Sequence, residues 1–203
     1  MKSDSIAFGI AGIMFGLIAG WMIGAQQAKV GPPVATPTAA AQSAAPSPGA
    51  STAAVLNEQQ VTAFKSAADR EPSNPAPRVQ LANLYFDAER YEDAIKWYSE
   101  GLKLGPKDPD VSTDLGVCYY YTNQPDKALA QFDESLKVNP KHLKTLLNVG
   151  IVRAFGKQDL KGAQTVWEQI IALAPDSQEA MQAKRALDSI KSAHPTLGSP
   201  AGS

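Results

Sequence analysis

Residues 81–106, LANLYFDAERYEDAIKWYSEGLKLGP, and residues 115–140, LGVCYYYTNQPDKALAQFDESLKVNP, are two copies of one pattern. A third, looser copy, VGIVRAFGKQDLKGAQTVWEQIIALAP, occupies residues 149–175. Each copy ends in a proline, and the prolines stand at positions 106, 140 and 175. Self-similarity at this spacing indicates a stack of similar supersecondary units.

Three kinds of residue recur before each terminal proline, the alanine and the aromatic residue at fixed distances and the small residue one position earlier in the third copy. A small residue comes first, then an alanine, and then an aromatic residue; the sets are Ala82, Gly116 and Gly150, then Ala94, Ala128 and Ala163, then Tyr98, Phe132 and Trp167. Each unit is therefore predicted to be two short amphipathic helices joined by a tight turn. The small residue lets the two helices approach, the aromatic ring fills the space between them, and the proline ends the second helix. One such unit cannot bury its apolar face alone, so the units are expected to stack.

This pattern resembles the tetratricopeptide repeat (TPR), in three copies at about residues 75–108, 109–142 and 143–177. The resemblance implies an all-α fold, an α-solenoid of three helix pairs. Some positions depart from the family pattern: the first-helix tryptophan is replaced by Arg78, Ser112 and Leu146, and the tyrosine kept as Tyr85 and Tyr119 becomes Arg153. The third turn is read as one residue longer than the others. Arg153 could bind a partner's carboxylate, but its stem is expected to lie on the adjacent capping helix.

Helices are expected on both sides of the repeats, which together with them would form a domain over residues 56–193. From Asn57 to about Arg70, apolar residues recur at helical spacing. A capping helix is predicted over residues 177–193, with Asp176 and Glu179 as a capping-box-like start. Its apolar stripe consists of Ala180, Ala183, Leu187 and Ile190. Residues 194–203 are predicted to be a disordered tail.

The amino-terminal part differs in composition from the repeats. After a short tail at residues 1–5, residues 6–25 are uncharged and about 30 Å long as a helix, the hydrocarbon thickness of a bilayer. The alternative is a cleaved signal peptide, but the positions before Ala25 and Ala28 make poor cleavage sites. A retained transmembrane signal anchor is therefore favoured. Residues 26–55, rich in Ala, Pro, Ser and Thr, are predicted to be a disordered linker.

Four glycines share one side of this predicted span: Gly12, Gly16, Gly20 and Gly24. Small residues at a spacing of four let two membrane helices come close together. The span is therefore expected to associate with a second copy or with a partner's helix, although glycine is also simply common in membrane helices. The expected location is a bacterial inner membrane, crossed once, with the repeats on the periplasmic side.

In TPR proteins the first helix of each repeat lines a concave groove, and the resemblance implies the same here. The expected peptide-binding residues are Asn83, Phe86, Asp87, Thr113, Tyr120, Tyr121, Lys144, Ile151 and Phe155. Val79, Val117 and Leu147 occupy groove positions too, but are expected to pack on neighbouring helices. Val79 also stands where some family members place a lysine that binds a peptide's terminal carboxylate, so that clamp is incomplete.

Catalysis and metal binding find little support in the sequence. The chain has one cysteine, two histidines and a net charge of −1, and it has no basic excess that would favour nucleic acid. Cys118 and His142 do not form a recognisable nucleophile–base pair, and there is no CxxC or HExxH motif. No cofactor is expected.

The function predicted from the sequence is that of a membrane-tethered scaffold that binds a peptide or protein segment in the groove of the repeats. The alternative is an accessory subunit of an envelope assembly machine, because small anchored TPR proteins of similar layout serve cytochrome c maturation and protein translocation. An enzyme is the least favoured class.

Overall fold

The computed structural model describes residues 55–105 and 107–194. Residues 1–54, which include the predicted span, linker and glycine stripe, lie outside the described residues, as does the predicted tail at 195–203. Within the described ranges, no helix has the length and apolar character needed to cross a bilayer. Residues 1–54 and 55–203 separate into two units, and the fold described below is that of the second unit.

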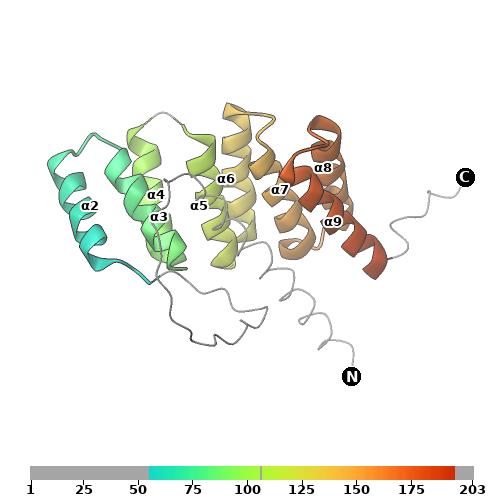
Figure 1. Cartoon of the computed structure of the whole chain (residues 1–203), viewed down its shortest axis with the longest axis horizontal. Coiled ribbons are helices and arrows are strands. Elements are labelled where there is room, and N and C mark those ends of the chain that lie inside the picture. The colour runs from blue at the N-terminus through green and yellow to red at the C-terminus, as the bar shows by residue number, and fades with distance from the viewer. Residues whose placement is uncertain (1–54, 106, 195–203) are drawn as a thin grey trace, which may run out of the picture. The chain divides into compact units, whose positions relative to one another are not determined.

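The described residues form helices and contain no strand. The α-helices are α2 (Glu58–Arg70), α3 (Ala76–Asp87), α4 (Tyr91–Leu104), α5 (Pro109–Tyr121), α6 (Pro125–Val138), α7 (Leu143–Ile151), α8 (Leu160–Leu173) and α9 (Gln178–Ala193), and a π-helical segment, η2 (Val152–Gly156), continues α7. In Figure 1 they follow one another side by side in chain order. The pairs α3–α4, α5–α6 and α7–α8 correspond to the three sequence repeats, and α2 and α9 flank them. The all-α solenoid expected from the sequence is confirmed.

Side chains with oxygen acceptors begin several of the helices. Asn57 and Asp108 each accept two backbone N–H groups at the starts of α2 and α5, which satisfies donors that the helix itself leaves unpaired. The start of α9 differs from the prediction, because the capping residue is Ser177, whose hydroxyl accepts from Ala180 N at 3.0 Å, and not Asp176. A proline stands in the first turn of α5 and of α6, where no N–H is needed.

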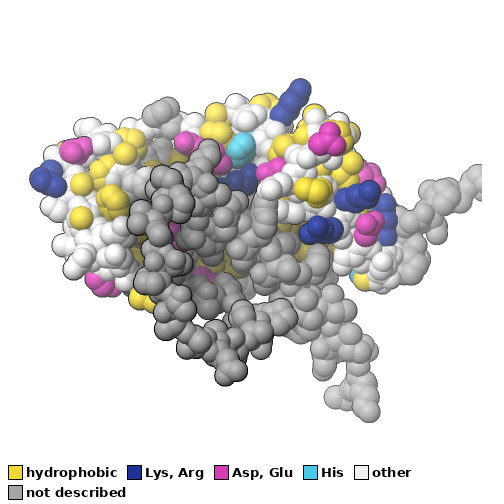
Figure 2. Space-filling model, in the orientation of Figure 1, with side chains coloured by type: hydrophobic (Ala, Val, Ile, Leu, Met, Phe, Trp, Pro, Cys, Tyr) yellow, Lys and Arg dark blue, Asp and Glu magenta, His cyan; other side chains and the backbone are white. Residues whose placement is uncertain are grey.

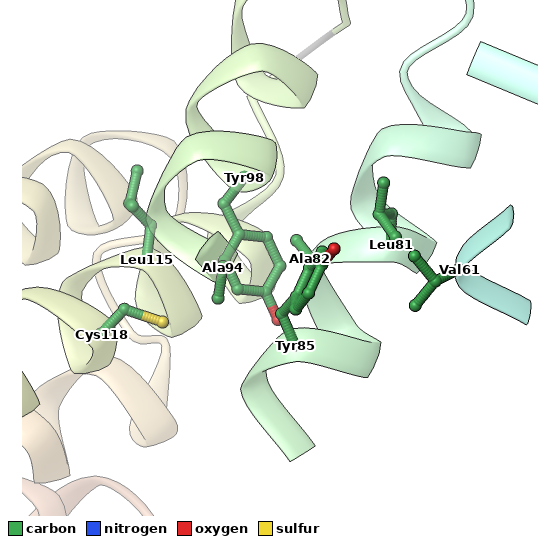
Figure 3. Packing of buried hydrophobic residues seen from close by; sticks show 8 residues of the cluster. All are labelled: Val61, Leu81, Ala82, Tyr85, Ala94, Tyr98, Leu115 and Cys118. Atoms are coloured by element: carbon green, nitrogen blue, oxygen red, sulfur yellow. The ribbon is translucent and has the colours of Figure 1, made fainter. Parts of the chain in front are cut away.

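The core of each repeat is the predicted contact between a small residue and an aromatic ring. Tyr98 lies between α3 and α4 against Ala82, and it is 1% exposed (Figure 3). A Cβ atom added at Gly116 would overlap the Phe132 ring, and one added at Gly150 would overlap the Trp167 ring. All three aromatic rings are buried. Val61 of α2 extends the first core beyond the repeats, as Figure 3 shows.

The third repeat holds its extra residue inside a helix, not in the turn. Glu89, Asn123 and Gln158 are the turn residues with positive φ, at 56°, 59° and 56°. Each stands seventeen residues before the terminal proline of its repeat, so the three turns are in register. The additional residue therefore lies before the third turn, where η2 widens the helix to take it in. The expectation of a longer turn was wrong for this reason.

Candidate functional site

The candidate site is the side of α3, α5 and α7, continued by η2, to which the nine predicted residues were assigned; it is here called the first-helix face. Contacts between successive repeats hold these helices in place: Lys144 of α7 reaches Asp114 of α5, and Thr145 of α7 reaches Thr113 of α5. A surface built on three helices that pack against one another can present its side chains with little freedom. That rigidity favours binding, because fewer groups must be ordered when a ligand arrives.

One part of the first-helix face is an aromatic cluster, which consists of Phe86, Tyr91, Tyr120 and Tyr121. Phe86 meets Tyr91 edge-on at 5.8 Å between ring centroids, and Tyr91 stacks on Tyr121 at 4.4 Å. Tyr120 lies 6.1 Å from Tyr121. The structure therefore brings together three of the predicted residues from α3 and α5.

Tyr91 links the others and was missed by the sequence reasoning. It is the first residue of α4, a second helix, and the family pattern assigns the groove to first helices only. The signal in the sequence was an aromatic residue directly after the turn. Burial raises the pKa of Tyr120 and of Tyr121 to about 12, and it raises the pKa of Tyr91 as well. The three hydroxyl groups therefore stay protonated at neutral pH and can donate hydrogen bonds.

The second part of the first-helix face is polar and joins α5 to α7. Lys144 Nζ lies 2.8 Å from Asp114 Oδ1 and 3.7 Å from Asp110 Oδ1, and His142 Nε2 lies 3.5 Å from the same Asp110 oxygen. Burial raises the pKa of the Asp114 carboxyl in spite of the nearby ammonium group. For Lys144, burial lowers the pKa, but the two carboxylates outweigh it and the net pKa is raised. The lysine therefore stays charged, and its charge is shared by two aspartates.

Asp87 is the residue of the first-helix face whose charge is not matched. It ends α3, is half-buried, and has no hydrogen bond or ion pair with the described residues. Burial raises the pKa of its carboxyl. Its charge in turn raises the pKa of Asp114 and of Tyr98, which places it within electrostatic reach of both.

Two predicted residues do not reach the surface. Thr113 is 0% exposed, and its hydroxyl lies 2.6 Å from that of Thr145 and 3.2 Å from that of Ser135, while it donates to the Pro109 carbonyl at 2.6 Å. Ile151 is 6% exposed. Both side chains therefore pack between repeats, and their assignment to an exposed binding surface is corrected. Val117 and Leu147 are buried, and Val79 packs against Gly101, as expected.

Asn83 has a structural role that its position did not reveal. The hydroxyl of the buried Tyr98 donates to Asn83 Oδ1 at 2.6 Å. Asn83 therefore satisfies a polar group of the core while its amide nitrogen remains at the half-buried edge of α3.

We expect Asn83→Ala to lower the free energy of unfolding by about 1–3 kcal/mol, because it leaves the Tyr98 hydroxyl without a partner in the core. In a Tyr98→Phe background the same change should cost clearly less, since no hydroxyl is left unpaired. Urea unfolding of the four variants in a double-mutant cycle measures the difference. Equal costs in both backgrounds would show that the hydrogen bond contributes nothing.

The third repeat contributes Phe155, which lies half-buried in η2. Next to it in the sequence, Arg153 turns toward the loop, where its Nη1 lies 3.0 Å from Asp159 Oδ2. The stem of Arg153 was predicted to lie on the capping helix, and that contact stays a prediction. Its guanidinium group pairs with the carboxylate of Asp159. The widened helix thus places an ion pair beside the end of the first-helix face.

Cys118 is a buried thiol whose pKa is raised by burial, so it is not a thiolate nucleophile at neutral pH. Within residues 55–105 and 107–194, no three His, Cys, Asp or Glu side chains come together as they would to hold a metal ion. The first-helix face presents aromatic contact area, tyrosine hydroxyl groups and carboxylates.

The fold and this face define the class of protein as an α-solenoid built from helix pairs. Residues 61–113 and 88–148 match the tetratricopeptide repeat family model. Among solved structures, MamA aligns with a TM-score of 0.55 at 18% identity over 63% of this chain and 77% of its own. The TPR domain of Sgt2 from Aspergillus fumigatus aligns with a TM-score of 0.54 at 24% identity, over 64% and 87%.

A third similar structure is the first TPR of Spaghetti (RPAP3) bound to the HSP90 peptide SRMEEVD, with a TM-score of 0.51 at 23% identity over 71% of this chain and 98% of its own. No curated protein matches the sequence significantly. The family model and the shared fold together support the tetratricopeptide repeat family for the helical unit.

Proposed function

We propose that this protein is a membrane-tethered interaction scaffold that holds an extended or helical peptide segment of a partner on the first-helix face. The observation that carries the proposal is the aromatic cluster of Phe86, Tyr91, Tyr120 and Tyr121, which a monomer leaves half-buried. Aromatic side chains give a large contact area at a low cost in conformational entropy, and they dominate many binding surfaces. The RPAP3 domain, which has the same fold, is a peptide binder according to its solved complex.

The tether is the second part of the proposal. Residues 6–25 would anchor the chain in a bacterial inner membrane, and the Pro-rich linker after them would hold the repeats away from the bilayer on the periplasmic side. Its support is the sequence alone: 20 uncharged residues and a Pro-rich spacer. We propose further that the glycine stripe of the span packs against another membrane helix, from a second copy or from a partner.

Tyr120→Ala tests the proposed binding surface. We expect it to weaken capture of the native partner about tenfold or more, which corresponds to the loss of a central aromatic contact of a binding surface. The full chain is solubilised in mild detergent from membranes of its own cells, and the recovered partner is quantified by mass spectrometry. The intact mass of the recovered chain shows at the same time whether residues 6–25 are retained.

Tyr119→Ala is the matched control. Tyr119 precedes Tyr120 on α5, but it packs against the first core, and Lys127 Nζ of α6 lies 5.6 Å from its ring centroid. This variant should retain capture. If Tyr119→Ala and Tyr120→Ala lower capture equally, or if Tyr120→Ala unfolds the domain as severely as loss of a core aromatic residue, then the first-helix face is not the binding surface.

A further inference from the structure

The charges on the first-helix face are unbalanced. Three carboxylates, those of Asp87, Asp110 and Asp114, lie on α3 and α5. Lys144 of α7 reaches Asp110 and Asp114, and His142 also lies within 3.5 Å of Asp110. Asp110 and Asp114 are one turn apart on α5, so they share a side of that helix. Lys144 is engaged by both, which leaves Asp87 as a half-buried negative charge without a partner among the described residues.

The position of the unmatched charge matters as much as its sign. Asp87 follows Phe86 directly, so it lies at the border between the aromatic cluster and the carboxylates of α5. In the view of Figure 2, several Lys and Arg side chains lie over α8 and α9, with acidic side chains among them. A partner that covers the first-helix face would remove water from Asp87, and a buried carboxylate without a cation is costly.

We propose that the partner segment is basic, an inference that rests on the function proposed above. An apolar or aromatic anchor of the segment lies on the Phe86–Tyr91–Tyr121 rings, and a lysine or arginine side chain binds Asp87. A basic segment is complementary in charge to this face, which a ligand must desolvate. The long stem of either residue reaches from the aromatic cluster to a carboxylate while its methylene groups cover the rings. Arginine also stacks on aromatic faces, which suits this border particularly well.

The same charges disfavour an acidic segment. The peptide in the RPAP3 complex, SRMEEVD, carries three carboxylate side chains. On the face described here, Val79 provides no positive charge, and the charge of Lys144 is already shared by Asp114 and Asp110. We therefore expect this chain to reject that peptide, although the two folds are alike.

An array of randomised nonapeptides tests the charge preference. The peptides are acetylated and amidated so that only side chains carry charge, SRMEEVD with a free carboxylate is added, and the probe is the full chain in detergent. We expect bound peptides to be enriched about threefold or more in Lys or Arg at one position beside an apolar residue, and SRMEEVD to stay at background. For the best peptide, Asp87→Asn should weaken binding about tenfold, the usual order of effect for a lost ion pair at a desolvated surface.

Variants separate this inference from the proposed function. Asp87→Lys should abolish the basic preference and favour Asp or Glu at the same position, whereas Asp133→Lys, the same charge change on an exposed residue of α6, should leave the selection unchanged. Asp87→Asn is not expected to lower the melting temperature, because the carboxylate has no partner to lose. Binding of peptides without any charge preference would overturn the basic partner and leave the scaffold standing. An array with no peptide above background would overturn both.

Discussion

Trp167→Ala should lower the free energy of unfolding by about 3–5 kcal/mol, as expected for a large aromatic residue removed from a packed core. Trp167 is 0% exposed and lies between α7 and α8, where it fills the space that Gly150 leaves open. Its indole N–H also donates to the Leu147 carbonyl at 3.3 Å. Alanine would therefore create a cavity and leave that buried carbonyl with one partner fewer. Urea unfolding of the full chain in detergent, followed by the helical circular dichroism signal, measures the loss.

Trp97→Ala is the control for this result. Trp97 lies on α4, is only partly buried, and packs at the margin of the first core. Removal of a tryptophan from that position should cost clearly less than removal of Trp167. If the two variants lose equal stability, then the aromatic position before the terminal proline does not have the special role in repeat packing that its recurrence suggests.

Gly150→Ala should destabilise the protein by about 1–2 kcal/mol, although alanine is the better helix former. In a helix, the exchange of glycine for alanine is worth about 1 kcal/mol in favour of the variant. Against this, overpacking of a core costs typically 1–3 kcal/mol, and the cost here should lie in the upper part of that range. The reason is that the new Cβ would overlap the ring of Trp167, which is enclosed on all sides and cannot move aside. Packing therefore outweighs propensity.

Gly101→Ala provides the comparison. There the new Cβ would meet one methyl group of Val79 at 2.9 Å and no other atom closer than 3.6 Å, a smaller overlap than that with the Trp167 ring. This variant should lose less stability than Gly150→Ala, or even gain some. The double variant Gly150→Ala with Trp167→Leu is a second check. Leucine leaves room for the new Cβ, so the double variant should lose less stability than the two single variants do in sum. A rise in melting temperature for Gly150→Ala alone would contradict the account.

The sequence predicts the packing within each repeat because that packing depends on local spacing. Ala82 and Tyr98, for example, are brought together by two helices and a turn of fixed length, so any repeat that keeps the spacing keeps the contact. The same logic predicted the buried stripe of α9, which includes Ala183 and Leu187. Spacing could not show that an inserted residue would enter a π-helix, because a longer turn satisfies the same spacing.

The first-helix face was predicted less well because exposure there depends on how one repeat is rotated on the next. Thr113 and Tyr120 both occupy groove positions in the family pattern, yet Thr113 lies under α7 and bonds to Thr145. Nothing in the single repeat distinguishes them. Asn83 was read as a surface amide because its partner, Tyr98, belongs to the next helix. The unmatched charge of Asp87 was equally hidden, since it becomes apparent only once Lys144 is seen to bind other carboxylates.

Site-specific photo-crosslinking in living cells can show whether a partner lies on the first-helix face. A photoreactive benzoylphenylalanine is placed at Phe86 or Phe155, where it keeps the phenyl ring and adds a benzoyl group. The controls carry it at Lys96 of α4 or Asp133 of α6, which are exposed on second helices. After irradiation, the account predicts a discrete adduct of one mass from positions 86 and 155 and none from 96 and 133. Adducts from 96 or 133, with positions 86 and 155 silent, would place the partner on the second helices and contradict the account.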